Sequence, residues 1–349
     1  MTDTADPRET SHHPRLRSTL YGHEGVENTL VSAFRAGRLH HAWLLAGPKG
    51  IGKATLAYRI ARYLLRYPDP ASAPDSMVVD PQDGVFKRVA ARGHSDLLVV
   101  ERSFDEKTKR LKGEIGVAEA RAVSQFFTRT AGEGGWRICI VDAADELNTV
   151  AANAILKILE EPPEKALIVL VTQQSPGRLL PTIRSRCIKQ IMSPLSGDLV
   201  GRVLREIDVD SEQDHDLQSL AHLASGSPGR ALELTETGGA KHLTTFEQLV
   251  SSRPPYDRRQ MIRLADQLSS RGEQLGYAAF CNLLREWLMR RAKTDAGQAM
   301  AGNAARWAEL YQDVDRSIEQ GNVLNLDRRS VMLEAFRKIE QAERIQLAT

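Results

Sequence analysis

A glycine-rich loop, GPKGIGK at residues 47–53, holds residue types whose spacing suits phosphate binding. It nearly matches the pattern G-x-x-x-x-G-K-[ST], in which backbone N–H groups and the positive end of the following helix hold phosphates. Gly47, Gly50 and Gly52 permit the tight turn. Lys53 could reach the β- and γ-phosphates of a nucleotide. The alternative is a glycine-rich turn that binds nothing. We favour a phosphate-binding scaffold, because an apolar run precedes the loop and a helical pattern follows it.

The metal side of this candidate site is incomplete. The residue after Lys53 is Ala54, where the pattern requires a hydroxyl that ligates Mg²⁺. Thr55 follows about 100° further round the helix and is poorly placed to replace that hydroxyl. The apolar run RICIVD ends in Asp142, the carboxylate expected at the end of a neighbouring strand. Thr55 and Asp142 are therefore candidate cofactor-binding residues. We expect any ATP or ADP to be held mainly by the loop backbone and Lys53.

Two arginines follow a later apolar run, in the segment LLPTIRSRC at residues 179–187. Arg184 and Arg186 stand two residues apart, and the residues alone favour two exposed arginines in a surface loop. The alternative is an arginine finger, a guanidinium offered to a γ-phosphate that a neighbouring chain binds.

A further arginine lies in the segment GSPGRALEL, which predicts a helix starting at Pro228 or Gly229. Arg230 falls in its first turn, where a cation opposes the helix dipole and costs some stability unless it has a partner. It is either an exposed arginine or a residue that faces the phosphates of a nucleotide.

The elements around these residues indicate an α/β domain. Between residues 24 and 222, helical patterns alternate with four continuous apolar runs: AWLLA, DLLVV, RICIVD and ALIVLVT. Continuous rather than alternating runs are typical of strands buried on both faces of a parallel sheet, with helices covering it. Residues 67–94 are rich in Pro, Asp and Ser and predict an irregular surface segment. The charged segment at residues 101–115 predicts a hairpin or loop with a solvated face.

From residue 198 onward every periodic stretch is helical, with GGAKH at residues 238–242 as a linker. The predicted organisation has four parts: a disordered N-terminal arm at 1–18, a P-loop α/β domain at 19–196, a small three-helix domain at 197–241 and an all-α domain at 242–349.

Composition excludes several classes of protein. The 349 residues are 42% hydrophobic and 26% charged, as in ordinary globular proteins. A formal net charge of +2 gives no argument for nucleic-acid binding over the whole surface. Three well-separated cysteines suggest neither disulfides nor a zinc site and suit a reducing cytoplasm. No apolar run is long enough to cross a membrane. Residues 1–15 contain no apolar h-region, so we do not expect them to act as a signal peptide.

Taken together, the motifs resemble AAA+ subunits of the bacterial DNA polymerase III clamp loader, most closely those of the delta-prime type. The most specific elements are the SRC motif and NAILKILEEPP, and the resemblance covers about residues 19–234. It implies an AAA+ domain, a three-helix lid and a C-terminal collar that joins five subunits in a ring. The arginine of SRC, here Arg186, would then act in trans on ATP held by the adjacent motor subunit.

Departures from the family pattern concern hydrolysis and zinc. AAA+ ATPases usually place a water-polarising Glu directly after the strand-end Asp, but this chain has Ala143. Asp145 or Glu146 could replace it only if the strand extended further. With Ala54, this change removes both the metal ligand and the general base, so we expect little or no hydrolysis. Many relatives carry a four-cysteine zinc module after the P-loop helix, and residues 67–94 contain no cysteine. We therefore expect no zinc.

The leading interpretation is a non-hydrolysing or weakly hydrolysing cytoplasmic clamp-loader subunit. It would complete a neighbour's ATP site through Arg186 and help load the sliding clamp onto primer-template DNA. The main alternative is an autonomous ATP-hydrolysing motor subunit in which Thr55 and either Asp145 or Glu146 replace the missing groups. A small-molecule kinase is disfavoured by the helical C-terminal third and by the SRC motif.

Overall fold

A computed structural model describes residues 10–108, 110–173, 179–207, 220–221, 223–252, 254–270, 272–297 and 301–348. The chain forms two compact units, Met1–Gly229 and Arg230–Thr349. Within the described ranges, no helix combines the length and apolar character needed to span a bilayer.

The first unit is built on a five-stranded parallel sheet with the strand order β2-β5-β6-β1-β7. The strands are β1 (Ala42–Ala46), β2 (Leu97–Val100), β5 (Arg137–Asp142), β6 (Ala166–Thr172) and β7 (Ile188–Ile191). Every residue of β1 and β6 is buried. The predicted α/β class is confirmed, and the four predicted strands are present. The edge strand β7 was not predicted, because its sequence IKQI is short and mostly exposed.

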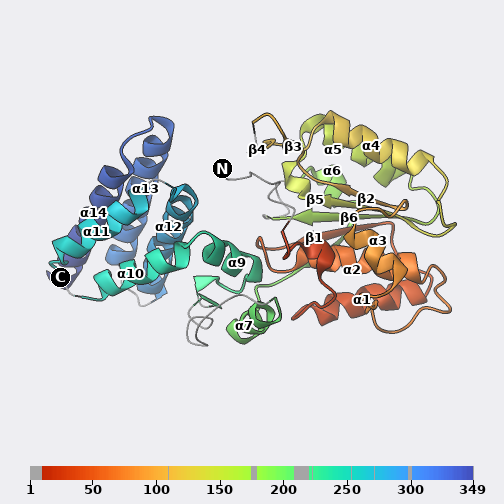
Figure 1. Ribbon diagram of the computed structural model, residues 1–349, viewed down its shortest axis with the longest axis horizontal. Helices are drawn as coiled ribbons and strands as arrows, with labels where there is room; N and C mark the ends of the chain where they lie inside the picture. The colour runs from red at the N-terminus through yellow and green to blue at the C-terminus, as the bar shows by residue number, and fades with distance from the viewer. Residues whose placement is uncertain are drawn as a thin grey trace. The chain divides into compact units, whose positions relative to one another are not determined.

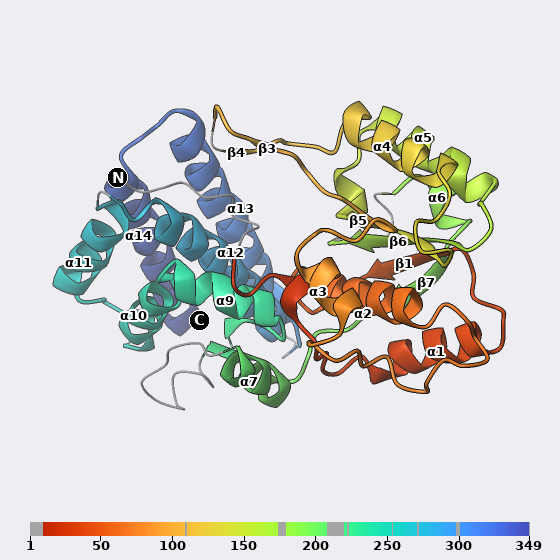
Figure 2. The same cartoon turned by 45° about the vertical axis from the view of Figure 1, so that its right-hand side comes forward.

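Helices cover both faces of this sheet. One face carries α1 (Glu24–Arg35), α2 (Lys53–Arg66) and α3 (Gly84–Ala90), and the other carries α4 (Val117–Thr128), α5 (Thr149–Glu160) and α6 (Pro181–Arg184) (Figures 1 and 2). Alternate residues of β1 serve the two cores: Trp43 and Leu45 join the α1–α2 side, whereas Ala42 and Leu44 join the α4–α5 side. This two-sided burial explains the continuous apolar runs.

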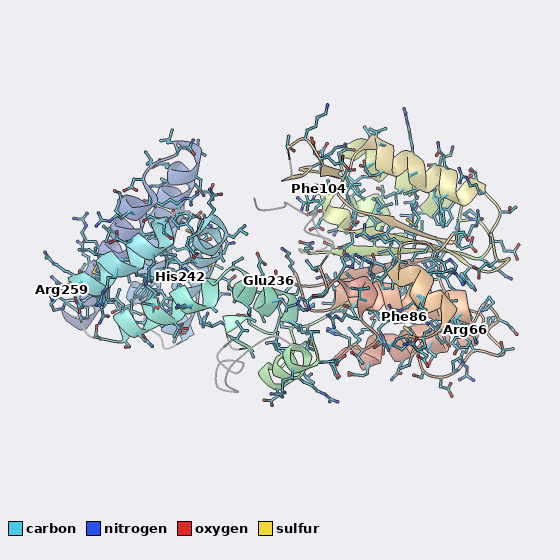
Figure 3. All side chains as sticks on the ribbon, viewed as in Figure 1. Arg66, Phe86, Phe104, Glu236, His242 and Arg259 are labelled. Carbon is cyan, nitrogen blue, oxygen red and sulfur yellow. The ribbon has the colours of Figure 1, made fainter. Side chains whose placement is uncertain are left out.

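Of two further segments, one differs from its sequence prediction and the other agrees with it. The stretch predicted to be irregular contains α3, on which Figure 3 labels Phe86. Val85, Phe86 and Val89 of this helix are buried. The polar flanks hid this apolar face. In the predicted charged hairpin, β3 (Phe104–Asp105) pairs antiparallel with β4 (Arg110–Leu111), as expected.

The N-terminal arm also differs from the prediction where the structure describes it. Residues 1–9 lie outside the described part, but Pro14–Leu16 form a 3-10 helix, η1, with Arg15 buried. Arg62 of α2 is 1% exposed and donates hydrogen bonds to the carbonyls of Arg15, at 2.9 Å, and Arg17, at 2.5 Å. A buried guanidinium requires acceptors, and this part of the arm supplies them.

Helices follow the sheet. They are α7 (Gly197–Glu206), α9 (Pro228–Glu236), α10 (Gly239–Ser251), α11 (Arg258–Ser269), α12 (Gln274–Gly297), α13 (Ala301–Val323) and α14 (Arg328–Ala348). The predicted linker at 238–242 is wrong, since α10 begins at Gly239. Of the predicted helix around residues 217–226, residues 217–219 and 222 lie outside the described part, and residues 220, 221 and 223 are helical. Aromatic side chains pack together in the second unit. The centre of the Phe246 ring lies 5.6 Å from that of Phe336 and 5.2 Å from that of Trp287. The boundaries predicted at 196/197 and 241/242 stay predictions.

Candidate functional site

The glycine-rich loop lies at the carboxyl end of β1, where a parallel sheet of this kind binds ligands. Gly47 directly follows β1 with φ +152°, and a Cβ there would come within 2.3 Å of the carbonyl oxygen of Met192. No larger residue fits. Gly52 then caps α2, which begins at Lys53. The predicted strand–loop–helix scaffold is therefore present.

Lys53 is folded back onto its own loop. Its side chain is buried, and Nζ donates a hydrogen bond to the carbonyl of Pro48. Burial lowers the pKa of Lys53 to about 8, although Asp142 and Asp145 oppose this shift. A cation in this position is ready for an anion, but one of its donors is already used within the loop.

Asp142 ends β5, and β6 lies between β5 and β1. The sequence predicted Asp142 at the end of a strand next to β1, but β5 is separated from β1 by β6. Thr172, the last residue of β6, pairs with Ala46 at the end of β1. Burial raises the pKa of Asp142 to about 6, and the nearby Glu101 adds to this effect. Lys53 opposes it. Thr172, completely buried, was not predicted as part of this edge; its position after six apolar residues was the available signal.

The acidic residues beyond Asp142 have structural partners. β5 ends at Asp142, Ala143 is buried, and Ala144–Glu146 form a 3-10 helix, η2. Asp145 accepts a hydrogen bond from the backbone N–H of Gln173 at 3.2 Å. Glu146 pairs with Arg102 at 2.9 Å. The strand extension that would place either carboxylate directly after the strand is absent.

The metal-binding groups do not fit Mg²⁺. Ala54 presents a methyl group where a hydroxyl ligand would be needed, which leaves Asp142 as the remaining candidate ligand of the motif. Ala143 stands where a carboxylate would polarise the attacking water, so it removes the general base rather than a metal ligand. Thr55 lies in the first turn of α2, one residue past the ligand position. No cluster of three or more His, Cys, Asp or Glu residues suited to a metal occurs in the described ranges. The cysteines Cys139, Cys187 and Cys281 are free thiols.

A segment from beyond the sheet packs directly against the loop. The Ser227 hydroxyl donates to the carbonyl of Lys49 at 2.8 Å, and the backbone N–H of Gly229 donates to the carbonyl of Gly50 at 2.9 Å. A Cβ on Gly229 would lie 2.9 Å from the Gly50 Cα, so glycine is required for this approach. From sequence, this GSPG motif predicted only the start of a helix and a candidate role for Arg230, not the packing of Ser227 and Gly229 on the loop.

His23 supports the same loop from its other side. The ring is buried, and its Nε2 donates to the carbonyl of Ile51 at 2.9 Å. Burial lowers the pKa of His23, which keeps the ring neutral. The sequence motifs do not predict a role for His23, because none of them includes it.

Arg230 has found an anionic partner. It lies in the first turn of α9, and its guanidinium pairs with the carboxylate of Glu286 on α12 within the second unit. This contact answers the dipole cost expected from sequence. It gives Arg230 a structural role, and its predicted role toward phosphates stays a prediction.

Arg186 lies at the amino-terminal ends of the parallel strands, whereas the glycine-rich loop lies at their carboxyl ends. β7 begins at Ile188, which pairs with Trp43, whereas Ile191 pairs with Ala46 beside the loop. Arg186 precedes β7 by two residues and therefore lies at the amino-terminal edge. At about 3.3 Å per strand residue, the length of β7 alone places the backbone of Arg186 roughly 10 Å or more from its own loop.

The Arg186 side chain is held on two sides. Its Nη2 lies 2.8 Å from Oε1 of Glu160, the last residue of α5. Its Nη1 donates to the carbonyl of Thr182 in α6 at 3.0 Å. In contrast, Nε of Arg184 is buried and has no hydrogen-bond partner among the described residues. The two arginines of the motif are thus structurally distinct.

Sequence comparison identifies the family. A family model described as DNA polymerase III, delta subunit matches residues 22–196, which are 175 of the 349 residues. The chain belongs to this family of clamp-loader AAA+ subunits. The match covers the whole sheet, the glycine-rich loop, Asp142 and Arg186.

Individual relatives agree. The chain is 35% identical over 198 residues to DNA polymerase III subunit delta' of Pseudomonas aeruginosa, which covers 57% of this chain and 56% of that protein. It is 34% identical over 205 residues to the delta' subunit of Escherichia coli, with 59% and 57% covered. The tau subunit of Escherichia coli is 28% identical over 229 residues, with 64% and 33% covered. The chain thus spans little more than half the length of its delta' relatives.

A solved structure of a DNA polymerase III gamma subunit-related protein from Thermotoga maritima matches 90% of this chain and 99% of its own, with 18% identity and a TM-score of 0.41. At that score the family assignment rests on the sequence comparison alone.

Proposed function

We propose that this chain is a delta-prime-type subunit of a DNA polymerase III clamp loader. In this role it joins ATP-binding motor subunits in a five-membered ring and helps load a sliding clamp onto primed DNA. It contributes Arg186 to the ATP site of an adjacent subunit and hydrolyses little or no ATP itself. The matches to delta', gamma and tau subunits support this class of assembly.

The position of Arg186 carries the proposal. The Arg186 guanidinium is held by Glu160 and Thr182 at the amino-terminal ends of the strands, away from the carboxyl ends where the glycine-rich loop lies. We therefore expect a nucleotide phosphate that Arg186 contacts to belong to another chain. A guanidinium is the group best suited to stabilise the charge of a transferring phosphoryl group from outside the site.

The state of the chain's own loop supports the second half of the proposal. Any ATP or ADP here would be bound by the backbone of residues 47–52, Lys53 and the positive end of α2. The residues at the metal side do not fit Mg²⁺, and Asp145 and Glu146 are engaged elsewhere. We therefore propose a site with little or no hydrolytic turnover rather than an autonomous motor.

The test uses the chain assembled with its motor subunits. Arg186→Ala removes the guanidinium and should lower ATP hydrolysis at the facing site by about 10³-fold, the typical contribution of an arginine finger. Ring assembly, measured by size-exclusion chromatography, should be unchanged. Arg184→Ala is the matched control from the same motif and should have the smaller effect on hydrolysis. Equal hydrolysis by the unmodified and Arg186→Ala complexes would refute the finger.

A further inference from the structure

The Arg186 side chain is partly exposed but is held by residues of α5 and α6. We call its two contacts, one from each of these helices, the frame. Glu160 contacts Nη2 from the end of α5, and the carbonyl of Thr182 accepts from Nη1 within α6. These two contacts come from two different helices, both of which precede Arg186 in the chain. Together they fix the plane of the guanidinium as well as its position.

Both sides of the frame are anchored in the core. Leu159, next to Glu160, and Ile183, next to Thr182, are buried in the same apolar cluster between the sheet and its α4–α5 face. Arg186 itself is attached to β7, which pairs with β1. The backbone around Arg186 is therefore fixed, and only a movement of the Arg186 side chain itself would displace the guanidinium.

The frame leaves donors for a ligand. A guanidinium has five N–H donors, and Glu160 and Thr182 each take one of them. About a third of the Arg186 side chain is exposed, with 36% accessible. The remaining donors can contact a phosphate while both contacts of the frame are kept.

Stability does not explain the pair. Glu160 is 46% exposed, and an ion pair this accessible to water contributes little to folding because solvent screens it. A carboxylate beside an arginine also weakens the attraction of that arginine for anions. The pair is therefore better explained by the orientation it gives to Arg186.

We infer that Glu160 is the positioning residue of the arginine finger, holding the Arg186 guanidinium in the orientation that a neighbouring subunit's phosphoryl group requires. This inference rests on the proposed function. Glu160 touches neither nucleotide nor metal and acts only through Arg186. Its effect belongs to the transition state, where a fixed charge needs no reorganisation as the reaction proceeds.

The experiment measures ATPase kinetics of the assembled complex with Glu160→Ala, Glu160→Gln, Arg186→Ala and the double variant. Glu160→Ala should lower kcat at the facing site by about 10- to 100-fold, as small misplacements of a reacting group do. KM for ATP should stay unchanged, because the motor subunit binds the nucleotide. Glu160→Gln keeps an acceptor for Nη2 and should recover part of the loss.

The double variant separates positioning from a structural role. If Glu160 acts through Arg186, Glu160→Ala adds no further loss to Arg186→Ala. Additive losses would show that Glu160 acts independently and would overturn the inference. Glu161→Ala, at the adjacent exposed carboxylate that does not pair with Arg186, is the matched control and should behave as the unmodified chain. Thermal unfolding and assembly should be the same for all variants.

The remaining outcomes are distinct. If Arg186→Ala lowers kcat but Glu160→Ala does not, the inference is wrong and the proposed function stands. If Glu160→Ala raises kcat, Glu160 competes with phosphate for the arginine, and positioning is again refuted. If Arg186→Ala has no effect, the proposed function fails and the inference fails with it.

Discussion

At the scale of single residues, two substitutions decide the chemistry of the glycine-rich loop. Ala54 and Ala143 remove a metal ligand and a general base from one site, whereas Lys53 and Asp142 remain and influence each other's pKa. Loss of both groups is consistent with a loop kept for structure. Ser227 and Gly229 use the loop carbonyls as acceptors, which gives the loop a packing role independent of nucleotide.

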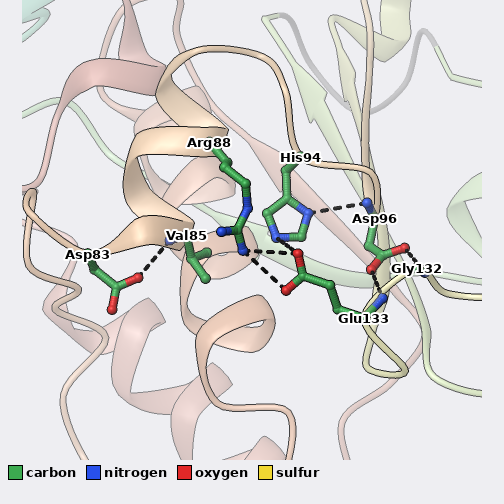
Figure 4. A network of polar contacts seen from close by, with 7 residues as sticks. All are labelled: Asp83, Val85, Arg88, His94, Asp96, Gly132 and Glu133. Atoms are coloured by element: carbon green, nitrogen blue, oxygen red, sulfur yellow. Dashed lines mark hydrogen bonds and ion pairs between the residues drawn. The ribbon is translucent and has the colours of Figure 1, made fainter.

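A histidine far from that loop predicts a pH dependence of stability. His94 is buried, and its Nδ1 accepts from the backbone N–H of Asp96 at 3.2 Å (Figure 4). Its Nε2 lies 3.8 Å from Glu133, a carboxylate that Arg88 already pairs with at 3.0 Å. Burial lowers the pKa of His94, with Arg88 adding to the shift and Glu133 opposing it.

Well above the ordinary histidine pKa of about 6.5, His94 is neutral in both the folded and the unfolded chain and does not contribute to the pH dependence of stability. Below that pKa, the unfolded chain gains a proton that the folded chain resists, so the free energy of unfolding falls by up to about 1.4 kcal/mol per pH unit. His94→Asn keeps an acceptor for the Asp96 N–H but removes the titration. Urea denaturation between pH 7.5 and 5.5 should give a shallower decline for this variant; identical slopes would contradict the account.

At the scale of elements, a buried arginine links α2 to the N-terminal arm. Arg62 donates to two arm carbonyls and lies 4.3 Å above the ring of Phe86 on α3. Burial lowers its pKa to about 10, so it stays charged at neutral pH. The arm, α2 and α3 are thus joined by one side chain.

Arg62→Ala should destabilise the chain by roughly 3 kcal/mol, because it leaves buried carbonyls without donors and removes the packing on Phe86. Arg66→Ala, on the same helix, is the control. Its side chain is 47% exposed and pairs with Asp83 at 2.7 Å, so the change should cost only about 0–1 kcal/mol. Chemical denaturation measures both. Equal losses would show that the arm contacts do not stabilise the unit.

The elements also show what sequence could and could not predict. β1, β5 and β6 were predictable because each is a continuous apolar run, whereas β7 has polar residues at its centre and lies at an edge. α3 escaped prediction because its short apolar face lies between polar flanks. Lys53 and Asp142 follow from motif spacing, but the Glu160–Arg186 contact depends on where two separate helices end. No local pattern records such a contact.

At the scale of the whole molecule, the chain combines a parallel-sheet unit with a second, helical unit. In the first unit the glycine-rich loop and Arg186 lie at opposite edges of one sheet. In the proposed ring, a subunit with this arrangement would face one neighbour at each end of its strands. Family membership rests on residues 22–196, which contain both ends. We propose that the function lies at the end that carries Arg186 and not at the loop.

The most direct test compares the two edges within one reconstituted complex by steady-state ATP hydrolysis. Lys53→Met keeps the length of the buried side chain and removes its charge, and Arg186→Ala removes the guanidinium. We expect unchanged hydrolysis for Lys53→Met and a loss of about 10³-fold at the facing site for Arg186→Ala. Loss of hydrolysis in Lys53→Met, together with full activity in Arg186→Ala, would contradict it.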